Sequence, residues 1–181
     1  MQRDPTAGPA SAKAYRALER MIVTLELAPG SVVTERVLIE HLSLGRTPVR
    51  EAIQRLTWEG LLEVRPRAGI LVAPLNAADW LRVIDARRGV EAVLARSAAR
   101  FVTDETAALF QATAVAMHDA VLASDVQGFL EADKSLDEAL ARAADNPFAA
   151  RLAAPLQTHS RRFWFRFRSG TGLAESAANH V

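Results

Sequence analysis

The feature that most constrains this chain is a change of hydrophobic period near residue 60. Before Gly60, four apolar residues follow the i, i+3, i+4, i+7 spacing of an amphipathic helix: Val49, Ala52, Ile53 and Leu56. After Gly60, apolar residues alternate with others on both sides of the sequence RPRAG: Leu62, Val64, Ile70 and Val72. Alternation around a turn sequence suits two short strands. A helix followed at once by a β-hairpin is therefore expected.

Two more helical patterns precede this helix. Apolar residues at spacings of three and four predict a first helix from Ser11, which Pro29 and Gly30 end: Tyr15, Leu18, Ile22 and Leu25. Thr34 suits the N-cap of a second, shorter helix that ends near Gly45. The leader, Met1 to Ala10, contains Pro5, Gly8 and Pro9 and no apolar period, so it is expected to be loose.

The rest of the chain is expected to be helical. Helical spacing begins at Asn76, and breaks near Thr103, Asp125, Asn146 and Ser169–Gly172 give roughly four helices after the first long one. The fold class is thus mainly α, with two domains. Residues 11–75 form a winged helix-turn-helix, and residues 79–181 form an all-helical, antiparallel bundle domain. Because the chain stops inside an alanine-rich helical pattern without a C-cap, the second domain is expected to be incomplete.

Composition and motifs exclude several classes. The absence of cysteine excludes disulfides, iron–sulfur clusters and thiolate zinc sites. No apolar run reaches the roughly 18 residues of a membrane span, so a cytoplasmic protein without a membrane partner is expected. A small helical enzyme is the less favoured alternative, because the sequence has no G-x-S-x-G, H-E-x-x-H or P-loop motif. The net charge of +1 gives no global argument for a polyanionic partner, so local charge placement must decide.

Local charge placement favours double-stranded DNA as the partner. On the predicted helix, Thr47, Arg50 and Gln54 lie opposite the apolar stripe, and Arg46 stands at the helix start. The arginine fork matches guanine O6 and N7 or a phosphate, and glutamine can pair with adenine. The hairpin adds Arg65 and Arg67 at its tip, and Gly69 lets the backbone approach a duplex closely. Exposed arginines are usually only solvated, but the order of elements favours DNA binding.

The segment PGSVVTERVLIEHLSLGRTPVREAIQRLTWEGLLEVRPRAGILV resembles the DNA-binding domain of GntR-family bacterial transcription regulators. The resemblance implies a homodimer that binds a short pseudo-palindromic operator. It places DNA contacts on Arg36, Arg46, Arg50 and Gly69. Gly45 stands where the family usually has a capping serine, a loss expected to cost only a few tenths of a kcal/mol.

The helical remainder is similar to the effector domain of the FadR-like branch, called the FCD type. An R..(apolar)E pattern of that domain matches Arg88 and Glu91. The resemblance implies that Arg88 points into a cavity and meets the carboxylate of a small organic acid. Taken alone, Arg88 and Glu91 make an i, i+3 ion pair. A regulator that binds DNA without sensing an effector is the other alternative.

A carboxylate on an apolar helix face raises the question of a metal. Asp133 lies between Phe129 and Leu136 and, once buried, needs an arginine, a cation or a water-filled pocket as its partner. In relatives, an aspartate and histidines hold a divalent metal. The resemblance thus implies a zinc, nickel or manganese site at Asp133, at Asp137 in place of the first histidine, and at His180. Carboxylates that face solvent or pair with arginines are the alternative.

The run HSRRFWFRFR, residues 159–168, mixes aromatic and basic side chains. Phe163 and Phe167 are helically spaced and are expected in the core. Its arginines are expected to be available to an anionic ligand.

Overall fold

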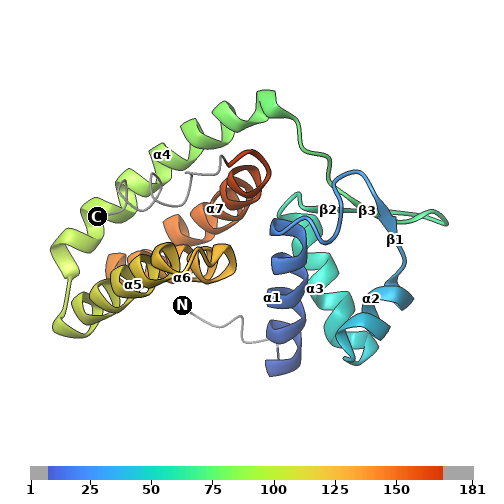
Figure 1. Ribbon diagram of the computed structural model, residues 1–181, viewed down its shortest axis with the longest axis horizontal. Coiled ribbons are helices and arrows are strands. Elements are labelled where there is room, and N and C mark those ends of the chain that lie inside the picture. Colours follow the sequence, from blue (N-terminus) through green and yellow to red (C-terminus); the bar gives the residue numbers. More distant parts are fainter. Residues whose placement is uncertain (1–7, 169–181) are drawn as a thin grey trace. The chain divides into compact units, whose positions relative to one another are not determined.

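The computed structural model of the chain describes residues 8–168 (Figure 1). These residues form seven α-helices and one three-stranded sheet. They divide into two compact units. The head unit comprises the described residues up to Val83 together with Thr158–Arg166, and the helical unit comprises Ile84–Gln157 and the two residues 167–168. No helix in this described part of the chain is long and apolar enough to cross a membrane.

Three helices open the head unit: α1 (Pro9–Val23), α2 (Glu35–Leu42) and α3 (Arg46–Trp58). The first helix starts at Pro9, inside the segment expected to be loose, because proline suits the first turn of a helix. The predicted N-cap of α2 is confirmed, since the Thr34 hydroxyl accepts the Val37 N–H at 3.3 Å. Ser43 adopts a left-handed conformation that ends α2 and starts the short turn into α3.

The predicted hairpin is confirmed as β2 (Leu62–Arg65) and β3 (Gly69–Val72). A third strand, β1 (Val32–Val33), pairs antiparallel with the other edge of β3, which gives the order β1-β3-β2. The sequence did not predict β1, because two residues are too short to show alternation.

The core of the head unit contains the apolar stripe of α3. Val49 and Leu56 are fully buried, and Ala52 and Ile53 are nearly so. They pack against apolar side chains of α1 and the sheet: Ala14, Leu18, Ile22, Leu61, Ile70 and Val72. This packing fixes which side of α3 faces outward.

The other helices are α4 (Ala77–Phe101), α5 (Asp104–Leu122), α6 (Val126–Ala144) and α7 (Pro147–Phe167). The predicted breaks near Thr103, Asp125 and Asn146 are confirmed, and each of these side chains accepts a backbone N–H at the start of the following helix. The predicted break at Ser169–Gly172 lies outside the described residues. The core of the helical unit is rich in alanine: Leu94, Ala98, Ala143, Ala144, Ala149 and Ala153.

Candidate nucleic-acid interface

The outward face of α3 carries the side chains that the sequence placed there. Thr47, Arg50 and Gln54 are exposed, and Arg46 is exposed at the first position of the helix. Gly45 precedes them as the N-cap and has no side chain to accept a backbone N–H. The start of α3 therefore presents two guanidinium groups beside free helix-end N–H groups, an arrangement that attracts phosphate.

One carboxylate lies beside both of these arginines. Glu35, the first residue of α2, has its Oε1 at 3.7 Å from Arg46 Nε and its Oε2 at 3.5 Å from Arg50 Nε. The arginine side chains remain 77% and 60% exposed, so they are free to reach a partner. Arg36 is more exposed still and pairs with Glu40, one turn along α2, at 2.7 Å.

The hairpin tip is basic and exposed. Arg67 has a left-handed backbone with φ of 63°, and its side chain is exposed, whereas Arg65 pairs with Glu63 at 2.9 Å. Among residues 8–168, no carboxylate forms an ion pair with Arg67. The tip thus holds one cation, Arg67, that no carboxylate of the described chain neutralises.

Gly69 is required by the fold for a reason that the sequence did not show. Its φ is 113°, and an added Cβ would lie 2.8 Å from the Val33 carbonyl oxygen and 3.0 Å from Val32 Cγ1. The close neighbour is β1, the strand that was not predicted. A side chain at this position would strain the backbone and push β1 away from β3. Contact between Gly69 and DNA stays a prediction.

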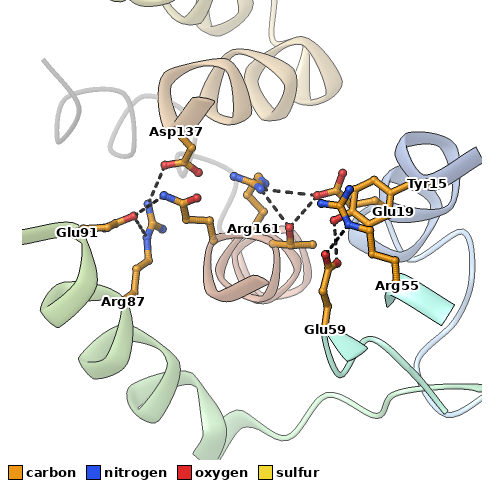
Figure 2. A network of polar contacts seen from close by, with 10 residues as sticks. Tyr15, Glu19, Arg55, Glu59, Arg87, Glu91, Asp137 and Arg161 are labelled. Carbon is orange, nitrogen blue, oxygen red and sulfur yellow. Dashed lines mark hydrogen bonds and ion pairs between the residues drawn. The ribbon is translucent and has the colours of Figure 1, made fainter. Parts of the chain in front are cut away.

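The far end of α3 is clamped to α1 by a buried aromatic group (Figure 2). The Tyr15 hydroxyl donates to Glu59 Oε2 at 2.7 Å, and the Arg55 guanidinium lies 3.7 Å from the centre of the Tyr15 ring. Burial, followed by the carboxylates of Glu19 and Glu59, raises the pKa of the Tyr15 phenol, which therefore stays a donor. Ser11 on α1 also donates to Glu51 on α3. These contacts hold α3 in one orientation, as a helix that reads DNA requires.

Part of α7 belongs to the head unit. Within Thr158–Arg166, the Thr158 hydroxyl donates to the buried Glu19 at 2.7 Å, and Arg161 lies 3.9 Å from the same carboxylate (Figure 2). His159 Nε2 lies 2.9 Å from the Glu59 carbonyl oxygen, directly after the last residue of α3. Burial lowers the pKa of His159, and the charge of Arg162 acts in the same direction.

This segment corrects the expectations for two arginines and one phenylalanine of the aromatic and basic run. Arg161 and Arg162 are buried at 7% and 1% exposure and are not available to an anionic ligand. Arg162 donates to the Ala73 carbonyl, and burial lowers its pKa to about 10. Phe163 is in the core, where it meets Trp80 edge to face, but Phe167 is 52% exposed and was wrongly expected there. The partners of these residues lie about 80 to 140 positions away in the chain, beyond any local pattern.

In the helical unit, Arg87 is half-buried, with 17% of its side chain exposed. Its Nε pairs with Glu91 at 2.7 Å, and its Nη2 lies 3.7 Å from Asp137 of α6 (Figure 2). Gln157 donates to the same Glu91 oxygen at 3.0 Å. Burial opposes the charge of Arg87, but Asp137, Glu91 and Asp133 together raise its pKa, so it stays a cation.

Arg88, the arginine that the resemblance pointed to, is exposed on the surface of α4. Arg87 lies seven residues before the buried Leu94, which puts the two on one helix face. That spacing could have selected Arg87, since both arginines lie within helical reach of Glu91.

Asp133 and Asp137 are both buried, one turn apart on α6. An arginine was one of the partners expected for Asp133, and the charge of Asp133 contributes to raising the pKa of Arg87. Within residues 8–168, no three His, Cys, Asp or Glu side chains are grouped to hold a metal, and His180 lies outside the described residues. A divalent cation at these two carboxylates would face the guanidinium of Arg87. The described donor set therefore fits an ion-pair cluster better than a metal site.

Comparison with known proteins gives consistent matches along the chain. The profile for bacterial regulatory proteins of the gntR family matches residues 10–72, and the FCD domain profile matches residues 82–181. The chain is 29% identical over 144 residues to the HTH-type transcriptional repressor RspR of Escherichia coli (strain K12), covering 80% of this chain and 63% of RspR. It therefore spans less than two thirds of that relative's length.

Two further matches are a second relative and a solved structure. An uncharacterised HTH-type transcriptional regulator from the TAR-I ttuE-ttuC' intergenic region of Agrobacterium vitis is 32% identical over 142 residues, which cover 77% of this chain and 82% of that protein. The solved structure of E. coli McbR/YncC aligns with a TM-score of 0.81 at 18% identity, over 96% of this chain and 82% of that one. At that identity the structural likeness supports the fold.

Proposed function

Because this chain belongs to the GntR family of bacterial regulatory proteins and carries an FCD domain, we propose that it is a DNA-binding transcriptional regulator. It recognises a short pseudo-palindromic operator. The observation that carries the proposal is the exposed face of α3, where Arg46, Thr47, Arg50 and Gln54 project from a helix clamped on its opposite side. Arginine and glutamine on such a face supply the donors and acceptors that base edges require.

The remaining residues of the interface contact the backbone of the duplex. Arg36 on α2 and Arg67 at the hairpin tip are exposed cations that can reach phosphates on either side of the groove. We propose that two copies bind together as a homodimer, with their α3 helices in successive major grooves. Half-sites would then be separated by about 34–36 Å, one turn of B-DNA, or by a multiple of that distance.

The test is a gel-shift titration with the promoter region adjoining the gene for this protein, repeated over a salt series. A regulator binds this duplex more tightly than a scrambled duplex of equal length, and the preference persists as salt rises. Arg50→Ala should weaken operator binding by about 1–3 kcal/mol and relax base preference at one position. If the two duplexes bind equally at every salt concentration, the proposal fails.

We further propose that the helical unit responds to a small organic acid through Arg87. The Arg87 side chain is only 17% exposed, and its contact to Asp137, at 3.7 Å, is long enough to be exchanged for a ligand carboxylate. A ligand that binds the folded protein raises its melting temperature by mass action. Arg87→Gln should abolish that rise for an active acid, whereas Arg88→Gln should preserve it. If Arg88→Gln abolishes the rise in melting temperature and Arg87→Gln preserves it, Arg88 is the arginine that binds the acid. If no acid raises the melting temperature of the wild-type protein, a regulator without effector sensing is favoured.

A divalent metal is the alternative occupant near Asp133 and Asp137. Adding Zn²⁺, Ni²⁺ or Mn²⁺ to protein treated with a chelator separates the two proposals. A metal site predicts a rise in melting temperature that Asp133→Asn removes. The ion-pair cluster predicts no rise.

A further inference from the structure

The position of Glu35 between the two recognition arginines is not explained by helix formation alone. Its two carboxylate oxygens face different side chains, Oε1 towards Arg46 Nε and Oε2 towards Arg50 Nε. The carboxylate comes from α2, whereas both arginines come from α3, so the contacts cross the turn of the helix-turn-helix. With 36% of its side chain exposed, Glu35 lies at the edge of the face that meets DNA.

Glu35 approaches each guanidinium most closely at Nε. Within the described chain, no hydrogen bond occupies the terminal Nη atoms of Arg46 or Arg50, which are the groups that read a base. Two parallel N–H groups are what guanine O6 and N7 accept. A long flexible side chain held at Nε has fewer orientations available, so less freedom is lost when its Nη atoms contact a base.

We propose that Glu35 is a positioning residue that sets the base selectivity of Arg46 and Arg50. The proposal rests on the DNA-binding function proposed above. Glu35 acts in two ways that have opposite effects on affinity. It orients the two guanidinium groups for bases, which favours the operator. Its negative charge also repels phosphates, which weakens binding to any duplex regardless of sequence.

These opposed effects give a signature that a purely structural role lacks. Glu35 is also the first residue of α2, where a carboxylate stabilises the positive end of the helix. If that were its whole role, losing the charge would lower the melting temperature and weaken operator and scrambled duplex in parallel. A positioning role predicts that binding to the scrambled duplex becomes tighter while the preference for the operator falls.

The experiment compares the full chain with the variants Glu35→Gln and Glu26→Gln. Glutamine keeps the shape of the side chain and removes its charge. Glu26 is the matched control because it is a similarly exposed carboxylate of the head unit, and its ion pairs are to Arg20 and His41 rather than to α3. Fluorescence anisotropy measures the dissociation constants for the promoter duplex and for a scrambled duplex of equal length, at several salt concentrations. Circular dichroism measures the melting temperature of each variant.

We expect Glu35→Gln to bind the scrambled duplex about two- to fivefold more tightly, as the loss of one exposed charge contact suggests. The ratio of the two dissociation constants should fall by about three- to tenfold, and Glu26→Gln should keep the wild-type ratio. An unchanged ratio in Glu35→Gln, or an equal fall in Glu26→Gln, would overturn the role of Glu35 while leaving DNA binding intact. Parallel weakening of both duplexes would also overturn it. A wild-type protein without preference would overturn the proposed function and this inference together.

Discussion

Replacement of Thr158 by valine tests whether residues 158–166 complete the head unit. Thr158 and Glu19 are both buried, at 1% and 4% exposure. The Thr158 hydroxyl donates a hydrogen bond to the Glu19 carboxylate at 2.7 Å. Valine keeps the shape of the side chain and removes the hydroxyl that donates to the buried Glu19 carboxylate. Hydrogen bonds to charged groups contribute about 1.5–3 kcal/mol, so a loss of about 2 kcal/mol is expected.

The assay is urea unfolding followed by tryptophan fluorescence. All three tryptophans of the chain lie in the head unit, at Trp58, Trp80 and Trp164, so the signal reports that unit alone. With a denaturant slope of about 1–2 kcal/mol per molar, the loss lowers the urea midpoint by about 1–2 M.

Thr57→Val is the matched control for this experiment. The Thr57 hydroxyl donates to the Ile53 carbonyl of its own helix at 2.8 Å, an acceptor already available to the helix backbone. Its loss should cost at most about 1 kcal/mol. If Thr158→Val lowers the urea midpoint no more than Thr57→Val, the hydrogen bond from Thr158 to Glu19 adds no more to the free energy of unfolding than a bond within one helix. The stability of the head unit then does not depend on that end of α7.

Three further changes have expected outcomes. Gly69→Ala should destabilise the head unit by about 1–3 kcal/mol in the same fluorescence assay, since its φ is 113° and the new Cβ would lie 2.8 Å from the Val33 carbonyl; an unchanged midpoint would refute this. Gly89→Ala should instead stabilise the helical unit by about 1 kcal/mol and raise its melting temperature, because Gly89 is inside α4 and an added Cβ would meet no atom within 4 Å beyond its own stretch of helix backbone; a lower melting temperature would contradict the helix there. Burial lowers the pKa of His159 below its unfolded value near 6.5, so its neutral form stabilises the head above that pH, and this stability is lost as pH falls through the folded pKa. His159→Gln should therefore flatten the decline of the unfolding free energy between about pH 7 and 5, and an equally steep decline would refute the assignment.

Local patterns predicted the elements of the interface well. The i, i+3, i+4, i+7 stripe placed the outward face of α3 correctly, and Thr34 and Asp125 act as the N-caps that their types suggest. These features depend on residues within one or two turns of each other, so a single stretch of chain contains the whole signal.

The choice of Arg88 over Arg87 shows where local pattern becomes ambiguous. Both arginines can reach Glu91 along the helix, one at i+3 and the other at i+4. Their surroundings differ only in the folded chain, because Arg87 lies near Asp137 of α6 whereas Arg88 is exposed. The same holds for Gly69, whose necessity depends on a two-residue strand about 37 positions earlier in the chain.

By itself, the sequence determined the helices, the hairpin, their order and the family of the chain, because hydrophobic period, capping residues and the RTPVREA motif are all local. Only the tertiary structure decided that Glu35 lies between Arg46 and Arg50, that Arg161 and Arg162 are buried, and that the end of α7 belongs to the head unit. These outcomes depend on desolvation and on charges brought together from distant positions. Such contacts form only when the chain has folded. The periodicity of a single segment therefore cannot predict them.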